Sequence, residues 1–286
     1  ETLADTFNPD WISSWNPLIP LKKEAEEKIA RQKTLVFLVG FPRSGTTLLE
    51  KILDSHFRID TLDEHPFVEH LEFLVSQLPE GHPAALGNLS AAQANDLRGA
   101  YFKAVEPLIE WRPGHLIVDK QPLNITRAGL INRLFPDVRF IFALRHPCDV
   151  CLSAFMQKFG PNDATASFHT LDDTVLLYAK TMGLWRQYQN VLSLQHHTIR
   201  YEDLVGNFEK ETAKLFKFLE LPWDKKSYEF SNNNKKSGWI STASYDQVTE
   251  PLYKRAKYRW RRYEKYFEPI IGTLQPFIEA FGYADD

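Results

Sequence analysis

Residues 35–49 read Leu35-Val36-Phe37-Leu38-Val39-Gly40-Phe41-Pro42-Arg43-Ser44-Gly45-Thr46-Thr47-Leu48-Leu49. The apolar run at 35–39 is typical of a buried strand, and two glycines bound the loop that follows it. Apolar residues at helical spacing after the loop predict a helix. A loop that closes onto a helix N-terminus aims several backbone N–H groups at one point, where the helix dipole adds partial positive charge. We therefore predict that this loop binds a phosphate-like anion.

The loop differs from the Walker A loop of nucleotide triphosphatases at one position. Its two glycines and Thr47 have the Walker A spacing, but Thr46 stands where those enzymes carry Lys, and the cation of the loop is Arg43. A P-loop kinase or NTPase remains an alternative that Mg²⁺-dependent ATP turnover would reveal. A second alternative is a non-catalytic module that binds a nucleotide or nucleic acid.

Composition sets broader limits. The chain has 286 residues, 43% hydrophobic and 25% charged, with a formal net charge of −3, which is ordinary for a globular protein. It has no apolar run near the roughly 20 residues that a membrane span needs, and no overall positive charge that would attract nucleic acid. We expect a soluble, cytoplasmic protein with neither a membrane nor a nucleic acid as partner. Because the chain begins with Glu1 rather than Met, an upstream domain or targeting segment is left open.

Strands and helices alternate along the chain. Hydrophobic patterns predict further strands at 57–62, 115–120, 138–144 and 197–201, helices at 67–78, 91–111, 171–190 and 208–219, and a loop at 81–88. Ser90 is the expected N-cap of the helix that follows it. This order predicts an α/β fold: a P-loop-type central parallel sheet flanked by helices on both faces, forming a single domain at 34–286 after an N-terminal extension at 1–33. Ligands of such sheets bind at the carboxyl ends of the strands, where this sequence has Gly40, Glu64, Lys120, Arg145 and Tyr201.

A second motif begins at the end of the strand at 138–144. Arg145 is followed eight residues later by Ser153. The pair is either a second anion site, built from a guanidinium and a hydroxyl, or an arginine at the sheet edge with an ordinary helical serine. Cys148 and Cys151 lie between them, and we interpret both as structural thiols because no second cysteine or histidine pair completes a metal site. We expect no metal.

Together these motifs resemble the sulfotransferase family. The resemblance extends in order through Tyr201-Glu202-Asp203-Leu204, 218–223, 242–248 and 259–263, and covers about Thr34 to Phe281. It is nearest to the tyrosylprotein-type branch and to bacterial sulfotransferase domains that often follow tetratricopeptide repeats. It implies transfer of a sulfuryl group from 3′-phosphoadenosine 5′-phosphosulfate (PAPS) to a hydroxyl on a phenol, a sugar or a peptide tyrosine, without a metal. The nucleotide product would be adenosine 3′,5′-bisphosphate (PAP).

The resemblance also implies roles for individual residues. The 5′-phosphosulfate would be held by the loop residues Arg43, Ser44, Gly45, Thr46 and Thr47. The 3′-phosphate would be held by Arg145 and Ser153. The remainder of the nucleotide would contact Tyr201, Ser244, Gln247 and Arg259, and the transferring sulfuryl group would be steadied by Lys120 and Ser244.

The catalytic base is the least determined residue. Cytosolic sulfotransferases use a histidine directly after the lysine and threonine of their motif, but here the strand end reads Asp119-Lys120-Gln121-Pro122. The tyrosylprotein branch implies Glu64 instead, with Asp63 and His65 as further candidates. From the sequence alone, the position of Glu64 favours a carboxylate at the start of a helix over a base. The chain departs from the family pattern at 65–68, where no arginine follows Glu64, and at Gln157 and Leu48. The first departure leaves a tyrosyl peptide acceptor in question, and the other two predict modest nucleotide affinity.

Overall fold

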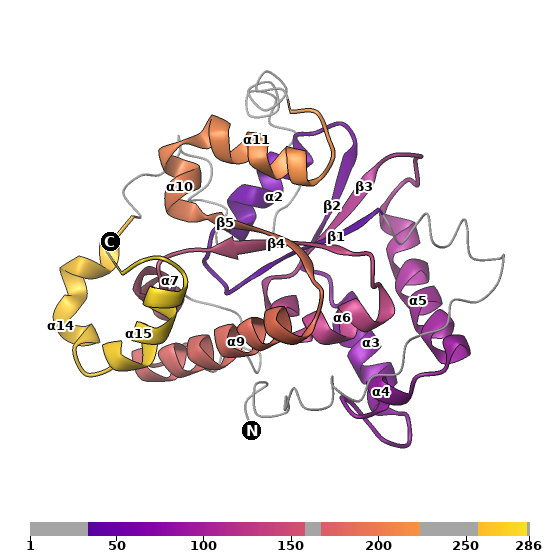
Figure 1. The fold of residues 1–286 in the computed structure, drawn as a ribbon, viewed down its shortest axis with the longest axis horizontal. Helices are drawn as coiled ribbons and strands as arrows, with labels where there is room; N and C mark the ends of the chain where they lie inside the picture. The colour runs from indigo at the N-terminus through magenta and orange to yellow at the C-terminus, as the bar shows by residue number, and fades with distance from the viewer. Residues whose placement is uncertain (1–33, 158–166, 224–256, 285–286) are drawn as a thin grey trace. The chain divides into compact units, whose positions relative to one another are not determined.

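The computed structural model describes residues 34–157, 167–223 and 257–284. Within them, five strands form one sheet in the order β2-β3-β1-β4-β5 (Figure 1). The strands are β1 (Leu35–Gly40), β2 (Ile59–Asp63), β3 (Leu116–Lys120), β4 (Arg139–Leu144) and β5 (Gln195–Arg200). β3 runs parallel to both β1 and β2, and Lys120 is in register with Leu38 on one side and Asp63 on the other. The predicted α/β fold, with a parallel sheet flanked by helices, is confirmed.

The burial of each strand follows from its place in the sheet. All six residues of β1, the middle strand, are buried, which explains why its sequence is an unbroken apolar run rather than an alternating one. The edge strand β2 keeps partly exposed positions between buried ones, and in the other edge strand, β5, only Ile199 is buried. Their weaker hydrophobic pattern is the expected sequence of an edge.

The chain divides into two compact units, each described here by itself. The first comprises Glu1–Val39, Phe57–Ile141 and Leu184–His196. In it, Phe37 of β1 contacts Tyr101 of helix α5 and Phe140 of β4, and Phe140 contacts Trp185. These rings join the sheet to the helices around it. The described helices that lie wholly in this unit are α3 (Phe67–Ser76), α4 (Ala85–Asn88), α5 (Ala91–Val105), η3 (Glu106–Leu108), η4 (Pro122–Arg127) and α6 (Ala128–Leu134).

Two predictions in this unit differ from the structure by more than two residues. The expected loop at 81–88 contains the short helix α4, because Ala85 and Leu86 are buried and packing overrides the loop-forming composition around them. The predicted helix at 91–111 ends at Val105 and continues as η3, because Pro107 has no backbone N–H to donate to the carbonyl oxygen four residues before it. The predicted N-cap is confirmed, since Ser90 forms a capping box with Gln93.

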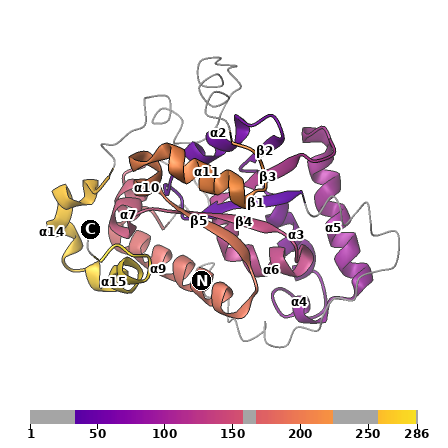
Figure 2. The same ribbon diagram turned by 45° about the horizontal axis from the view of Figure 1, so that its top comes forward.

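The second unit comprises Gly40–His56, Phe142–Gly183 and His197–Asp286. In it, α10 and α11 lie side by side (Figures 1 and 2), and α15 packs on α7. None of the described helices has the combination of length and apolar character needed to cross a bilayer. The remaining helices are α2 (Thr46–Asp54), α7 (Pro147–Phe155), α9 (Leu171–Val191, which continues into the first unit), α10 (Tyr201–Gly206), α11 (Phe208–Phe218), η6 (Arg259–Tyr263), α14 (Glu264–Phe267) and α15 (Ile271–Ala280).

Candidate active site

The predicted anion loop joins β1 to α2 in the second unit. A close contact at Gly40 and the backbone conformation of Gly45 explain its two glycines. A Cβ on Gly40 would lie 2.6 Å from the carbonyl oxygen of Ala143, so only glycine fits there. Gly45 is the N-cap of α2 and has a φ of 99°, in the left-handed region that favours glycine. The Ser44 hydroxyl donates to the Phe41 carbonyl oxygen at 2.6 Å, which tightens the turn.

The two predicted anion motifs meet at their arginines. Arg43 Nε donates to Ser153 Oγ at 3.2 Å, across 110 residues of sequence. Arg145 Nη1 donates to the Arg43 carbonyl oxygen at 3.3 Å, and its guanidinium lies 5.0 Å from the centre of the Tyr201 ring. The loop and the Arg145–Ser153 motif therefore belong to one cluster in this unit.

This cluster concentrates positive charge. Arg43 and Arg145 are both buried, and burial together with the neighbouring Arg145 lowers the pKa of Arg43 to about 10. The Arg43 guanidinium therefore remains charged at neutral pH. Two buried cations beside a helix N-terminus favour binding of an anion.

The predicted base and lysine lie at neighbouring strand ends in the first unit. Lys120 Nζ is completely buried, and it pairs with Glu64 Oε1 at 2.7 Å and with Asp63 Oδ1. The Glu64 backbone N–H donates to the Lys120 carbonyl oxygen at 2.8 Å. Glu64 has a φ of 53°, unusual for a residue with a side chain. This conformation ends β2 and places the half-exposed carboxylate beside the lysine.

Other sequence predictions have different outcomes. Ser244, Gln247 and the extension at 1–33 lie outside the described residues. Arg259 is exposed at the start of η6, and its Nη2 lies 3.5 Å from Met156 Sδ. His65, a further candidate for the base, stacks on Phe67. Thr46 and Thr47 are buried in the first turn of α2.

The cysteines have the character expected of structural thiols. Cys148 and Cys151 are free and buried. Burial raises the pKa of Cys148 to about 12, with the nearby Asp149 carboxylate adding to the effect. A thiol with so high a pKa stays protonated and is a poor nucleophile.

Sequence reasoning missed one member of the cluster. Asp149 lies between Arg145 and Ser153 in the second motif, and its carboxylate contacts Arg145 and the backbone of Trp260. An acidic residue four positions after an arginine was visible in the sequence. Its partner 111 residues further along was not.

Comparison with known proteins agrees with this geometry. The family model described as "Sulfotransferase family" matches residues 36–225, which include the anion loop, Glu64, Lys120, Arg145 and Ser153. The chain belongs to the sulfotransferase family. An uncharacterized protein of Aquifex aeolicus (strain VF5) is 31% identical to this sulfotransferase chain over 258 residues, which is 85% of the chain and 32% of that protein.

More distant relatives support the same family. The protein-tyrosine sulfotransferase of Drosophila melanogaster is 24% identical over 245 residues, covering 80% of this chain and 47% of that protein. The sulfotransferase chain thus spans a third to a half of the length of these two relatives. The solved sulfotransferase domain from the curacin biosynthetic pathway has a similar fold, with a TM-score of 0.52 and 19% identity, covering 79% of this chain and 89% of that one.

Proposed function

We propose that this chain transfers a sulfuryl group from PAPS to a hydroxyl acceptor and releases PAP. The observation that carries the proposal is the contact between the two anion motifs, in which Arg145 binds the Arg43 carbonyl oxygen and Arg43 binds Ser153. A nucleotide with anionic groups at both its 3′ and 5′ positions matches a cluster with two cations. Membership of the sulfotransferase family, and similarity to the Drosophila protein-tyrosine sulfotransferase, support the same chemistry.

The proposed roles follow the family resemblance. Arg43, Ser44, Gly45, Thr46 and Thr47 hold the 5′-phosphosulfate, Arg145 and Ser153 hold the 3′-phosphate, and Tyr201, Ser244, Gln247 and Arg259 hold the remainder of the nucleotide. The acceptor oxygen attacks sulfur while the bond between sulfur and the 5′-phosphate oxygen breaks, leaving the electron pair on PAP. Glu64 takes the acceptor proton, and Lys120 with Ser244 stabilises the charge that develops on the sulfuryl oxygens and the leaving oxygen. No metal is required in this scheme.

Asp63 makes the role of Glu64 testable. Lys120 keeps one carboxylate partner when Glu64 is neutralised, because Asp63 also contacts its Nζ. Glu64→Gln should therefore preserve the buried lysine and its surroundings while removing the proton acceptor. A loss of transfer in this variant would then reflect chemistry rather than a collapsed site.

The test measures two quantities on purified protein: PAP binding by calorimetry, and transfer from radiolabelled PAPS to phenolic, glycan and peptide acceptors. We expect Glu64→Gln to bind PAP like the unmodified chain and to lose about 100-fold or more of the transfer rate. Glu110→Gln is the matched control, because Glu110 is exposed and pairs only with the surface residue Arg112 among the contacts described. Full turnover by Glu64→Gln would remove Glu64 from the mechanism.

The same two measurements on the unmodified chain test the proposed function itself. Absence of both PAP binding and transfer to every acceptor pool would refute the proposal. Turnover of ATP with Mg²⁺ that survives Arg145→Ala would instead indicate a P-loop kinase or NTPase.

A further inference from the structure

One carboxylate in the second unit contacts both the Arg145 side chain and the C-terminal segment. Asp149 lies in the first turn of α7, and its side chain has no exposed surface. Its Oδ2 is 3.7 Å from Arg145 Nη2, and its Oδ1 accepts a hydrogen bond from the Trp260 backbone N–H at 2.9 Å. The two oxygens of Asp149 therefore face two different segments: Arg145, which lies between β4 and α7, and Trp260 of η6.

Aromatic contacts beside Asp149 hold the same segment. The imidazole of His146 stacks on the Trp260 indole, with 5.2 Å between ring centres and 17° between planes. The rings of Tyr258 and Tyr283 meet His146 edge-on at 5.8 and 5.1 Å. The His146 backbone N–H donates to Glu202, whose other carboxylate oxygen accepts from the Tyr283 hydroxyl. The beginning of α7 is thus the surface on which η6 is docked.

The other side of Arg145 faces the anion loop. Its Nη1 donates to the Arg43 carbonyl oxygen, and Tyr201 lies against the guanidinium. A continuous series of contacts consequently runs from Trp260 through Asp149 and Arg145 to Arg43. A guanidinium that is held on several sides has a fixed direction, and a fixed direction is what recognition of a phosphate requires.

We propose that Asp149 is a positioning residue that couples the anion site at Arg145 to the docking of η6. The proposal rests on the proposed function, because it takes the 3′-phosphate of PAP as the ligand of Arg145. A nucleotide that fixes Arg145 also fixes Asp149, and Asp149 in turn holds the backbone of Trp260. Such coupling is reciprocal, so an undocked η6 weakens nucleotide binding by the same factor by which the nucleotide strengthens docking.

The variant Asp149→Asn separates the two contacts of the carboxylate. The amide oxygen still accepts from the Trp260 N–H, but the charge that orients Arg145 is lost. We expect the dissociation constant for PAP to rise roughly tenfold, and PAP to stop protecting η6 from hydrogen exchange. In the unmodified chain, PAP should slow exchange of the Trp260 amide by roughly fivefold or more.

The control is Asp203→Asn. Asp203 belongs to the same unit, is exposed, and lies 3.9 Å from Arg200 rather than beside Arg145. Its substitution should leave both the PAP affinity and the exchange of the Trp260 amide unchanged. The two variants remove the same charge, so a difference between them in PAP affinity or in Trp260 exchange reflects where the carboxylate lies and not the net charge of the chain.

Each outcome decides the question. Unchanged PAP affinity in Asp149→Asn, with only a lower unfolding temperature, would reduce Asp149 to a structural residue and overturn the inference. Tighter PAP binding would show that Asp149 acts only as a repelling charge, and would also overturn it. If the variant does not fold, the unmodified chain decides, because unchanged exchange at Trp260 after PAP addition contradicts the coupling. An unmodified chain that fails to bind PAP at all refutes the proposed function, and the inference with it.

Discussion

Gly45 shows at the scale of one residue how the anion loop depends on backbone geometry. Its φ of 99° is strained for any residue with a Cβ, and an added Cβ would lie 2.9 Å from Cδ2 of Tyr201. Tyr201 also lies against Arg145. A side chain at position 45 would therefore displace a ring that borders the second anion motif.

We expect Gly45→Ala to destabilise the chain by about 2 kcal/mol, because the left-handed conformation alone costs 1–2 kcal/mol and the clash adds to it. PAP binding should weaken as well. The matched control is Gly99→Ala, since Gly99 is an exposed helical glycine with no atom within 4 Å of an added Cβ. Alanine at position 99 should raise the free energy of unfolding by as much as about 1 kcal/mol. Thermal unfolding without PAP measures the stability of each variant, and the shift on adding PAP measures binding. Equal stability of the two variants would contradict the argument.

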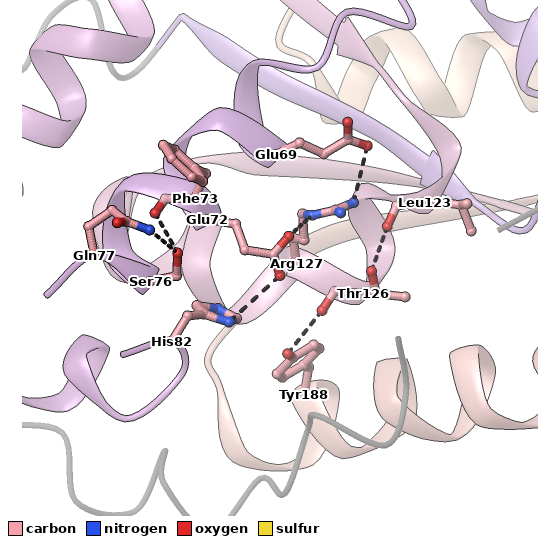
Figure 3. Close-up of polar contacts among 10 residues, drawn as sticks. All are labelled: Glu69, Glu72, Phe73, Ser76, Gln77, His82, Leu123, Thr126, Arg127 and Tyr188. Carbon is pink, nitrogen blue, oxygen red and sulfur yellow. Dashed lines mark hydrogen bonds and ion pairs between the residues drawn. The ribbon is translucent and has the colours of Figure 1, made fainter. Parts of the chain in front are cut away.

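At the scale of elements, a buried arginine joins the helices that follow β2 and β3. Arg127, at the end of η4, donates from Nε to Glu72 of α3 at 2.7 Å and lies 3.5 Å from Glu69 (Figure 3). Burial lowers the pKa of His82, which also faces Glu72. Because His82 is then neutral at pH 7, Arg127 is the cation that balances Glu72. Since α3 and η4 begin within three residues of Glu64 and Lys120, these ion pairs anchor both elements.

We expect Arg127→Met to lower the free energy of unfolding by about 3 kcal/mol, because it leaves a mostly buried carboxylate without its cation. The double variant Arg127→Met with Glu72→Met should recover much of this loss, since removing both charges avoids the unpaired one. Urea unfolding of the single and double variants provides the measurement. Arg112→Ala is the surface comparison, and its unfolding midpoint should not move. A single variant as stable as the parent chain would show that the pair contributes nothing.

At the scale of the whole molecule, one buried acid shapes the dependence of stability on pH. Burial raises the pKa of Asp119 to about 7, although the hydrogen bond from Tyr101 and the charge of Lys120 lower it. The unfolded carboxyl has its usual pKa near 4, so between pH 4 and 7 the folded chain holds the extra proton. The contribution of Asp119 to stability is therefore full below pH 4 and is lost as the pH rises through 7.

We expect Asp119→Asn to remove this dependence. The free energy of unfolding of the variant minus that of the parent chain should be larger at pH 8 than at pH 4.5, by on the order of 2–4 kcal/mol. Urea unfolding at the two pH values measures the gain, and Asp96→Asn, on the exposed face of α5, is the control. A difference between variant and parent that is the same at both pH values would contradict the assignment.

Much of the fold could be predicted because its decisive signals are local. The apolar run of β1, the glycines of the loop and the N-cap at Ser90 each act within a few residues. Helix α4 was missed because its formation depends on burial of Ala85 and Leu86 by distant parts of the chain. The resemblance implied only that Arg43 and Ser153 bind the same nucleotide, and their contact was not predicted. The contact of Asp149 with Trp260 was not predicted either, because no periodicity links positions 111 residues apart.

The backbones of Arg43 and Glu64 carry a consequence for engineering. Both residues are non-glycine, and both have left-handed φ values, of 75° and 53°. Glycine at either position would relax the chain, so a screen that selects only for heat resistance would enrich glycine there. The most heat-resistant clones would then be those that had lost the proposed anion-binding guanidinium or the proposed proton acceptor.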